Sequence, residues 1–419
     1  MDEDVDAFKK EFKRFKRPSE DDIKDIIDFT QPERFNEILT IQTVVDPPPL
    51  GASISDVQSS CNELGLTLPS EWKVYSLKTI PGLIFITNPF LCGGQHYWIQ
   101  KCLLQYPLLP NVTNLDSHIS RTGSGQIWPM GDSPVSVHKD SLLYKLRWVT
   151  LGYHYNWTSK LYHKEHHSPF PSDLSLLSHF ILSSVGFPDF KAEAAIVNYY
   201  HFESTLSGHT DHSEADLTSP LISLSFGQSA IFLIGGHTKS IPPLALMIRS
   251  GDIIIMSKES RLAYHGVPKI LRPGNDDAPI PYCLSREALL KRREIQKDNT
   301  KCSICGATLI ERDNSLKRGR NEKEDQKGEE SYCSKRKALI DEQLSGSKTQ
   351  EPNIKSPSIE TQDDTPCNST DNTVSSEVTD GHDFMCRDCE WLHLNWTDIE
   401  CYMNYSRINI NVRQVGEIK

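Results

Sequence analysis

The chain has 419 residues, of which 37% are hydrophobic and 24% are charged, and its formal net charge is -11. This length predicts one large or two medium domains, and the absence of any run of about 18 uninterrupted apolar residues excludes a membrane-spanning helix. Because the start, MDEDVDAFKKEF, lacks the apolar stretch of a secretory signal and its acids argue against a mitochondrial transit peptide, we expect an intracellular protein.

An amphipathic helix is predicted near the N-terminus. Phe8, Phe12 and Phe15 follow an i, i+4, i+7 spacing, with lysines and arginines between them. We expect the phenylalanine stripe to dock on the body of the protein and the basic face to be solvated; the alternative is an arm that contacts phosphates. Two further helices are predicted, over residues 94–106 and 172–186.

Strand signals begin at about Glu193. Short runs rich in β-branched residues alternate with polar or Gly/Pro turns: AAIVNYYHF, LISLSF, AIFLIG, LALMIRS, GDIIIMS and, near the end, RININVR. Six or more such strands without helical periodicity between them favour a sandwich or jelly roll over alternating βαβ units. The pattern breaks after about Pro281 and resumes at Arg407.

One triplet has the spacing of a metal site. His209 and Asp211 are two apart, so their side chains project to the same side of a turn, and His265 follows a predicted strand. Two imidazoles and one carboxylate on one face of the ion are typical of non-haem Fe(II) oxygenases. Alone, the triplet also fits a hydrogen-bonded turn histidine, and His212 and His237 compete for the ligand role.

The last predicted strand carries an unusual set of polar side chains. Apolar residues alternate there with two cations and two amides: Arg407, Asn409, Asn411 and Arg413. Burying two arginines is costly unless anions meet them, and a dicarboxylate co-substrate supplies two. The alternative is a solvated edge strand, which does not explain why the polar residues are only cations and amides.

The metal triplet and the last strand match features of a known protein family. The sequence resembles the AlkB-like 2-oxoglutarate and Fe(II)-dependent dioxygenases, most closely the branch of the first animal AlkB homologue. The matching segments are GLIFITNPF, KLRWVTLGYHYNW, PFPSDL, EAAIVNYYHFESTLSGHTDHSE, LISLSFGQSAIFLIGG, SGDIIIMSKESRLAYHGVP and RININVRQ. The resemblance implies an α+β fold: a double-stranded β-helix (jelly roll) core with flanking helices, a nucleotide-recognition lid and a large disordered insertion before the last core strand.

The expected organisation has four parts. Residues 1–70 form an N-terminal helical extension, and 71–283 form the dioxygenase core with its lid at about 117–168. Residues 284–395 form the insertion, and 396–419 contain the final jelly-roll strand.

Site residues follow from the resemblance, position by position. The metal ligands it implies are His209, Asp211 and His265. The residues it implies for 2-oxoglutarate are Asn198, Tyr199, Tyr200, Arg407, Asn409, Asn411 and Arg413, with Asn411 in place of the family's usual Thr. Those it implies for the substrate base are Trp128, Tyr153, His154, Tyr155, Asn156 and Asp211, although an aromatic cluster by itself is more often core. Nearby basic residues could track phosphates: Lys145, Arg147, Lys160 and Lys164.

The chemistry implied by the resemblance is oxidative demethylation of nucleic acid. With Fe(II) as its cofactor, the protein would consume 2-oxoglutarate and O2 and release an N-methyl group as formaldehyde, with succinate and CO2 as co-products. The suggested substrates are 1-methyladenine in tRNA and N6-methyladenine in DNA, reached by taking the base out of its stack. The alternatives are a protein hydroxylase or histone demethylase on the same fold, and a non-catalytic module that binds modified nucleic acid. We expect a monomer that has no membrane partner. We expect it in the nucleus, the cytoplasm or both, and the family resemblance also suggests the mitochondrion.

The insertion has features of its own. Residues 341–380 hold nine acids and two lysines, a charge of -7, with few apolar residues, so we expect disorder there. Two C-x2-C pairs bracket it: Cys302 with Cys305, and Cys386 with Cys389. Four thiolates in two tight pairs can bind a structural zinc, although two unrelated reduced pairs are the alternative and His382 could substitute. Basic clusters at 317–320 and 335–337 are of the kind that direct nuclear import.

Overall fold

The computed structural model describes residues 6–42, 44, 54–91, 93–121, 125, 127–128, 139–273 and 396–418. All of them belong to one compact unit formed by residues 1–309 and 386–419. The predicted insertion, with its four cysteines, its acidic stretch and its basic clusters, lies outside the described residues. Among the helices that are described, none combines the length and the apolar character that a membrane span requires.

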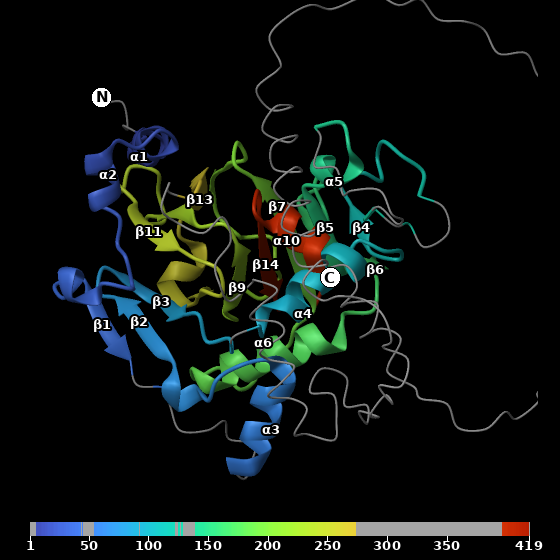
Figure 1. Ribbon diagram of the computed structural model, residues 1–419, viewed down its shortest axis with the longest axis horizontal. Coiled ribbons are helices and arrows are strands. Elements are labelled where there is room, and N and C mark those ends of the chain that lie inside the picture. Colours follow the sequence, from blue (N-terminus) through green and yellow to red (C-terminus); the bar gives the residue numbers. More distant parts are fainter. Residues whose placement is uncertain are drawn as a thin grey trace, which may run out of the picture. The chain divides into compact units, whose positions relative to one another are not determined.

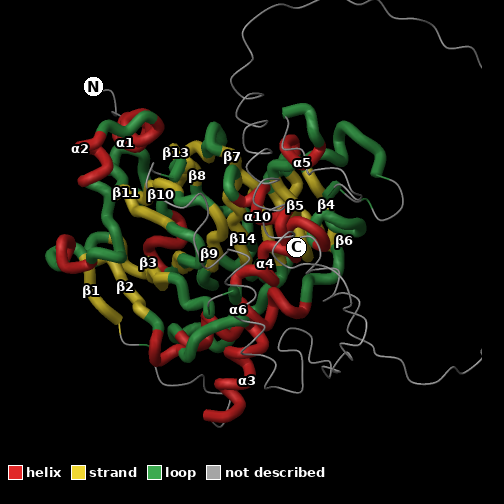
Figure 2. The backbone as a smooth tube through the Cα atoms, in the orientation of Figure 1, coloured by secondary structure: helices red, strands yellow, loops and turns green. Residues whose placement is uncertain are grey.

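Two antiparallel sheets form the centre of the described unit (Figures 1 and 2). The ten-stranded major sheet has the order β1-β2-β3-β12-β9-β14-β7-β5-β4, with β6 paired to β5, and the four-stranded minor sheet has the order β11-β10-β13-β8. The strands of the major sheet are β1 (Leu39–Gln42), β2 (Lys73–Leu77), β3 (Ile80–Thr87), β4 (Val112–Thr113), β5 (Trp148–Asn156), β6 (Leu161–His167), β7 (Ala194–His201), β9 (Leu221–Gly227), β12 (Ile253–Met256) and β14 (Ser406–Arg413). Those of the minor sheet are β8 (Leu206–His209), β10 (Ala230–Ile234), β11 (Leu244–Ile248) and β13 (His265–Ile270).

The six predicted strands are all present, as β7, β9, β10, β11, β12 and β14. The two antiparallel sheets with flanking helices confirm the jelly-roll class. The other strands were not predicted from the residues. Strand β6, LYHKEHH, is mostly exposed and lacks an apolar face. Strand β13 contains Gly266 and Pro268, residues that are more typical of turns than of strand interiors.

The α-helices are α1 (Ala7–Lys16), α2 (Glu20–Lys24), α3 (Ile54–Leu64), α4 (Gln95–Gln100), α5 (Leu142–Lys145), α6 (Ser172–Ser184) and α10 (Trp396–Met403). Short helical turns are η1 (Pro32–Phe35), η2 (Pro69–Glu71), η3 (Lys101–Gln105) and η4 (Lys258–Leu262). The helix predicted over 94–106 is α4 continued by the π-helical turn η3, and that predicted over 172–186 is α6. Helix α10, which precedes the last strand, was not predicted.

Helix α1 docks its aromatic stripe on the minor sheet, as predicted. Phe8 and Phe15 are buried in a cluster with Ile231 and Leu233 of β10, and the Phe8 N–H donates to the Lys239 carbonyl at 2.9 Å. The Phe8 ring lies so close to Gly208 that a Cβ at that position would overlap it. Because Gly208 precedes His209, the helix supports the strand that carries this predicted ligand.

Strand β14 lies in the middle of the major sheet, between β7 and β9 (red in Figure 1). Ile408, Ile410 and Val412 are fully buried in the larger core cluster, together with residues of α4 and α6. The alternation of β14 therefore buries one apolar face and turns its arginines and asparagines to the opposite face. This confirms a buried central strand and rejects the solvated edge strand.

Candidate metal and co-substrate site

The metal triplet is assembled by the pairing of two strands of the minor sheet. His209, the last residue of β8, is the cross-strand partner of His265, the first residue of β13, and their ring centroids are 4.3 Å apart. Asp211 follows two residues after β8. Its Oδ1 lies 3.8 Å from Nε2 of His209 and its Oδ2 lies 3.8 Å from Nε2 of His265. The three side chains thus meet at one point.

Backbone carbonyls set the orientation of both imidazoles. Nδ1 of His209 donates to the Ser207 carbonyl at 2.9 Å, and Nδ1 of His265 donates to the Ala263 carbonyl at 3.0 Å. With Nδ1 of each ring bonded to a carbonyl, Nε2 is the nitrogen that faces Asp211. A metal-ligating histidine commonly has such a second partner on its other nitrogen.

The surroundings keep the donors in the protonation states that a metal needs. Burial and the neighbouring His209 lower the pKa of His265 to about 4, so its imidazole is neutral. Burial acts to raise the pKa of Asp211, but Arg413 and the two histidines outweigh it and hold that pKa well below its usual range. A neutral imidazole of His265 and an ionised carboxylate of Asp211 are therefore available together.

These residues fit a divalent metal. Within the described part of the chain, His209, Asp211 and His265 are the one group of three or more potential ligands whose donor atoms all lie within 4.8 Å of one another. The competitors are occupied elsewhere: His212 is exposed and bonds Thr210, and His237 bonds the Glu259 carbonyl. Two nitrogens and one oxygen from one side suit Fe(II) with open positions for co-substrates.

Arg407 has the properties of an anion receptor. Arg407 is 2% exposed, and its guanidinium donates to the Gln228 carbonyl at 2.9 Å and to Ser225 Oγ at 2.7 Å. Both partners are neutral, and no described carboxylate lies within ion-pair distance of it. Burial lowers the pKa of Arg407 to about 10. A buried cation with neutral partners is costly until a carboxylate binds, so the site fits one end of 2-oxoglutarate.

Strand pairing brings most of the predicted co-substrate residues to one face of the major sheet. Arg407 lies opposite Tyr200, and Asn409 lies opposite Asn198, across the β7–β14 pair. Asn409 donates to Ser223 Oγ at 2.8 Å and to the Leu224 carbonyl at 3.0 Å, and Asn411 donates to Asn409 Oδ1 at 2.9 Å. Through this hydrogen bond, Asn411 helps to hold the side chain of Asn409 in place.

Tyr199 requires a correction. Neighbouring residues of a strand point to opposite faces, so Tyr199 lies on the other side of β7 from Asn198 and Tyr200. Its hydroxyl donates to the Cys102 carbonyl, and its ring belongs to the larger core cluster. Tyr199 therefore packs the core and does not face the co-substrate side.

Arg413 differs from Arg407, because its charge is already neutralised. It donates to Asp211 Oδ2 at 2.9 Å and to the Tyr162 hydroxyl at 3.2 Å, and it lies 3.5 Å from Glu214 Oε1. The sequence had suggested that a dicarboxylate supplies the anions for both arginines. The structure instead pairs Arg413 with protein carboxylates, while its buried Nε has no partner and can still donate to a ligand.

The β5–β6 hairpin carries the aromatic residues expected near a substrate base. Tyr153, His154, Tyr155 and Asn156 are partly buried, and the Tyr155 hydroxyl bonds Ser213 Oγ at 3.3 Å. Ser213 follows the metal loop, so the hairpin is tied to the site. Trp157 at the tip is 50% exposed and packs against Trp148 and Tyr155.

Trp128 is placed differently from expectation. Its side chain is 3% exposed and meets the Tyr402 ring edge-on, with centroids 5.9 Å apart. It is a core residue in this structure, and it offers no free face for stacking on a base. The four basic residues named for phosphate contact, Lys145, Arg147, Lys160 and Lys164, are exposed as that role requires.

Three buried residues next to the triplet were not singled out from the sequence. They are Tyr162, Glu214 and Arg261, which contact one another, Arg413 or Asp211. The sequence did contain a signal for two of them, since both are charged residues within the segments that match the family. Glu214 lies three residues after Asp211, and Arg261 lies four residues before His265. Their contact across 47 residues could not be read from the sequence alone.

Comparisons with known proteins agree with this geometry. Residues 95–302 match the family described as the 2OG-Fe(II) oxygenase superfamily. The chain is 44% identical over 288 residues to the nucleic acid dioxygenase ALKBH1 of Homo sapiens, covering 67% of this chain and 73% of that protein. It is 40% identical to the tRNA demethylase abh1 of Schizosaccharomyces pombe, covering 48% and 72%. It is 29% identical to the DNA N(6)-methyladenine demethylase ALKBH1A of Arabidopsis thaliana, covering 67% and 88%.

Proposed function

The chain belongs to the 2OG-Fe(II) oxygenase superfamily, and on this premise we propose that it removes N-methyl groups from nucleic acid. It is a 2-oxoglutarate-dependent dioxygenase. The observation that carries the proposal is the coincidence of the His209, Asp211 and His265 triplet with a buried Arg407 that has only neutral partners. A module that only binds nucleic acid needs neither.

The protein's residues have distinct parts in this activity. His209, Asp211 and His265 would hold Fe(II), and Arg407 with Asn409, Asn198 and Tyr200 would hold 2-oxoglutarate. When bound with O2, these groups supply oxidation of the methyl C–H bond, with succinate, CO2 and formaldehyde as products. Arg413 orients the Asp211 carboxylate, and the surrounding buried side chains exclude water from the reacting groups.

The relatives and the β5–β6 hairpin both support a nucleic-acid substrate. Relatives are named for action on nucleic acid, tRNA and N6-methyladenine in DNA, and we propose 1-methyladenine in tRNA and N6-methyladenine in DNA as candidates for this chain. Tyr155 and Trp157 give aromatic faces beside the metal loop, and Arg147, Lys160 and Lys164 are exposed cations near them in the sequence. Aromatic faces with nearby cations suit an unpaired base and its phosphates.

Turnover is the test. The full chain would be incubated with Fe(II), 2-oxoglutarate and O2 on a 1-methyladenine tRNA stem-loop and on a single-stranded N6-methyladenine DNA, with demethylation followed by mass spectrometry. Loss of the methyl group from one substrate, and its retention with Asp211→Ala, is the expected result. Succinate formation that neither nucleic acid stimulates would reject this substrate class and favour a protein substrate.

Two minor proposals lie outside the described residues. We propose a structural zinc on Cys302, Cys305, Cys386 and Cys389, which metal analysis of the purified protein before and after exchange of these cysteines to serine would test. We also propose nuclear and cytoplasmic residence, with a mitochondrial fraction as the family-based alternative, which imaging of a tagged chain with the clusters at 317–320 and 335–337 neutralised would test.

A further inference from the structure

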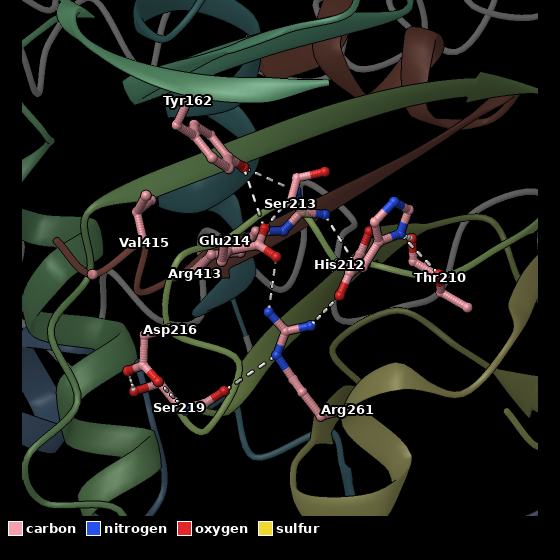
Figure 3. Close-up of polar contacts among 12 residues, drawn as sticks. Tyr162, Thr210, His212, Ser213, Glu214, Asp216, Ser219, Arg261, Arg413 and Val415 are labelled. Carbon is pink, nitrogen blue, oxygen red and sulfur yellow. Dashed lines mark hydrogen bonds and ion pairs between the residues drawn. The ribbon is translucent and has the colours of Figure 1, made fainter. Parts of the chain in front are cut away.

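A buried ionic cluster is joined to the metal triplet through Asp211, and Figure 3 shows its members Glu214, Arg261 and Arg413. Two arginines, Arg261 and Arg413, meet two carboxylates, Glu214 and Asp211, and all four side chains are 10% exposed or less. The Tyr162 hydroxyl completes the group. Glu214 and Arg261 bond none of the three ligand side chains, since Arg261 reaches only the main-chain carbonyl of Asp211, whereas Arg413 donates to the Asp211 carboxylate.

Arg261 uses three donors of its guanidinium at once. It donates to the Glu214 carboxylate at 3.0 Å, to the Asp211 carbonyl at 2.6 Å and to the Ser219 carbonyl at 3.2 Å. The dashed lines around Arg261 in Figure 3 trace this fork. Since one bond holds the main chain of Asp211, Arg261 fixes the position of the ligand loop after β8.

Glu214 joins the two arginines. One oxygen, Oε2, accepts from Arg261, while the other, Oε1, lies 3.5 Å from Arg413 and accepts from the Tyr162 hydroxyl at 3.4 Å. Arg413 in turn donates to Asp211 Oδ2. Asp211 is thus held from two directions, by Arg261 at its carbonyl and by Arg413 at its carboxylate, and Glu214 is the link between them.

The charges of the cluster balance without any ligand. Two guanidiniums face two carboxylates, so the net charge is zero. Without the charge of Glu214, the two guanidiniums would face a single carboxylate, that of Asp211. The cluster would then carry a net charge of +1 next to the residues that bind a divalent cation. The cluster is buried, so this excess would be weakly screened.

We propose that Glu214 is a positioning and charge-balancing residue for the metal site. It pairs with Arg261 and shares Arg413 with Asp211, so that Arg413 holds Oδ2 of Asp211 in place while Oδ1 stays available to the metal. The Glu214 carboxylate bonds Arg261 and Tyr162 and lies near Arg413, so it would act on the metal and the co-substrate indirectly, through these residues. This inference rests on the metal and co-substrate site and is independent of which nucleic acid or protein is the substrate.

The test measures two affinities of the full chain carrying Glu214→Gln, a change that keeps the shape and removes the charge. Mn²⁺ binding is measured by calorimetry under argon, and 2-oxoglutarate binding is measured at saturating Mn²⁺. We expect the Kd for Mn²⁺ to rise about tenfold, because a divalent cation meets one additional positive charge nearby. The Kd for the dianion 2-oxoglutarate should stay the same or fall, for the same reason.

The different expected changes in the Kd values for Mn²⁺ and for 2-oxoglutarate distinguish this role from purely structural support. A residue that only holds the fold would weaken both ligands together when changed, and that outcome, or an unchanged Mn²⁺ affinity, would overturn the proposal. The matched control is Asp28→Asn, which removes a carboxylate from a bidentate pair with Arg249 outside the cluster and should leave both affinities unchanged.

A second variant covers the case in which loss of a buried ionic partner prevents folding. Glu214→Asp keeps the charge and withdraws it by one methylene from both arginines. We expect it to weaken Mn²⁺ binding less than Glu214→Gln and to leave 2-oxoglutarate binding unchanged. Equal loss of both affinities in Glu214→Asp would assign Glu214 a structural role.

Discussion

Nε2 of His209 and Nε2 of His265 each lie 3.8 Å from a different oxygen of Asp211, because the two histidines are direct cross-strand partners. We expect Asp211→Asn, which keeps the shape and removes the charge, to weaken Mn²⁺ binding by more than about 100-fold and to abolish turnover. Calorimetry and succinate release measure the two effects. The control is His237→Gln, outside the triplet; equal Mn²⁺ affinity in both variants would mean that the metal binds elsewhere.

Arg407 should act on the co-substrate alone. Arg407→Gln removes a buried cation that has neutral partners, so we expect the Kd for 2-oxoglutarate to rise about 100-fold with the Kd for Mn²⁺ unchanged. The melting temperature of the ligand-free protein should not fall, because burial disfavours this charge and lowers the pKa of Arg407 to about 10.

Arg249→Gln is the matched control, since it removes an arginine whose charge is paired with Asp28. It should lower the melting temperature and spare 2-oxoglutarate binding. The reverse pattern between the two variants would contradict the role given to Arg407.

The docking of α1 beneath the metal strand can be tested by a double-mutant cycle. Gly208→Ala places a methyl group against the Phe8 ring, and we expect a loss of about 1–3 kcal/mol of unfolding free energy. Phe8→Ala removes the ring at a cost of about 3 kcal/mol. The double variant should lose clearly less than the sum, as measured by urea unfolding; strict additivity would show that the two residues do not meet.

His201 should make stability depend on pH. Its ring is buried, stacks on Tyr144 with centroids 4.3 Å apart, and bonds Ser406 and the Tyr144 carbonyl. Burial, with Arg147 adding to it, lowers the pKa of His201 to about 4. A histidine with a lowered pKa contributes stability above its ordinary pKa of about 6.5 and loses it as the pH falls toward 4.

This group should therefore contribute about 2 kcal/mol less at pH 5 than at pH 7. Urea unfolding of the metal-free protein at both pH values, beside His201→Gln, measures the difference. The variant should take up one proton fewer on unfolding at pH 5. Parallel pH dependences of the wild type and the variant would place the titration in another residue.

Trp157 is expected to contact nucleic acid. Its ring is half exposed at the tip of the β5–β6 hairpin, and loss of one stacked base costs about 1–3 kcal/mol. Trp157→Ala should thus weaken binding of a single-stranded oligonucleotide at least about fivefold in fluorescence anisotropy. Leu176→Ala, an exposed apolar residue on α6, is the control; equal effects of the two changes would remove the hairpin from the interface.

Residue spacing predicted that His209 and Asp211 share a side and that β14 buries one apolar face. The family resemblance, not the spacing, added His265, because its position depends on the pairing of β8 with β13. The alternation of a strand also places Tyr199 on the core face. The contact of Glu214 with Arg261 depends on how β8 and η4 meet in space. Likewise, the burial of Trp128 depends on α10, whose eight residues give too short a pattern to predict a helix.

The place of β14 in the sheet has a consequence for synthesis of the protein. Strands β7 and β9 cannot gain their shared neighbour until residues 406–413 have left the ribosome. Residues 274–395, a span of 122 residues, are translated between β13 and α10, which takes roughly 6–24 s at about 5–20 residues per second. During this interval the nascent chain already contains all three metal ligands but lacks Arg407 and Arg413. We therefore expect a ribosome-bound chain ending before residue 396 to expose the edges of β7 and β9 to chaperones and to be unable to consume 2-oxoglutarate.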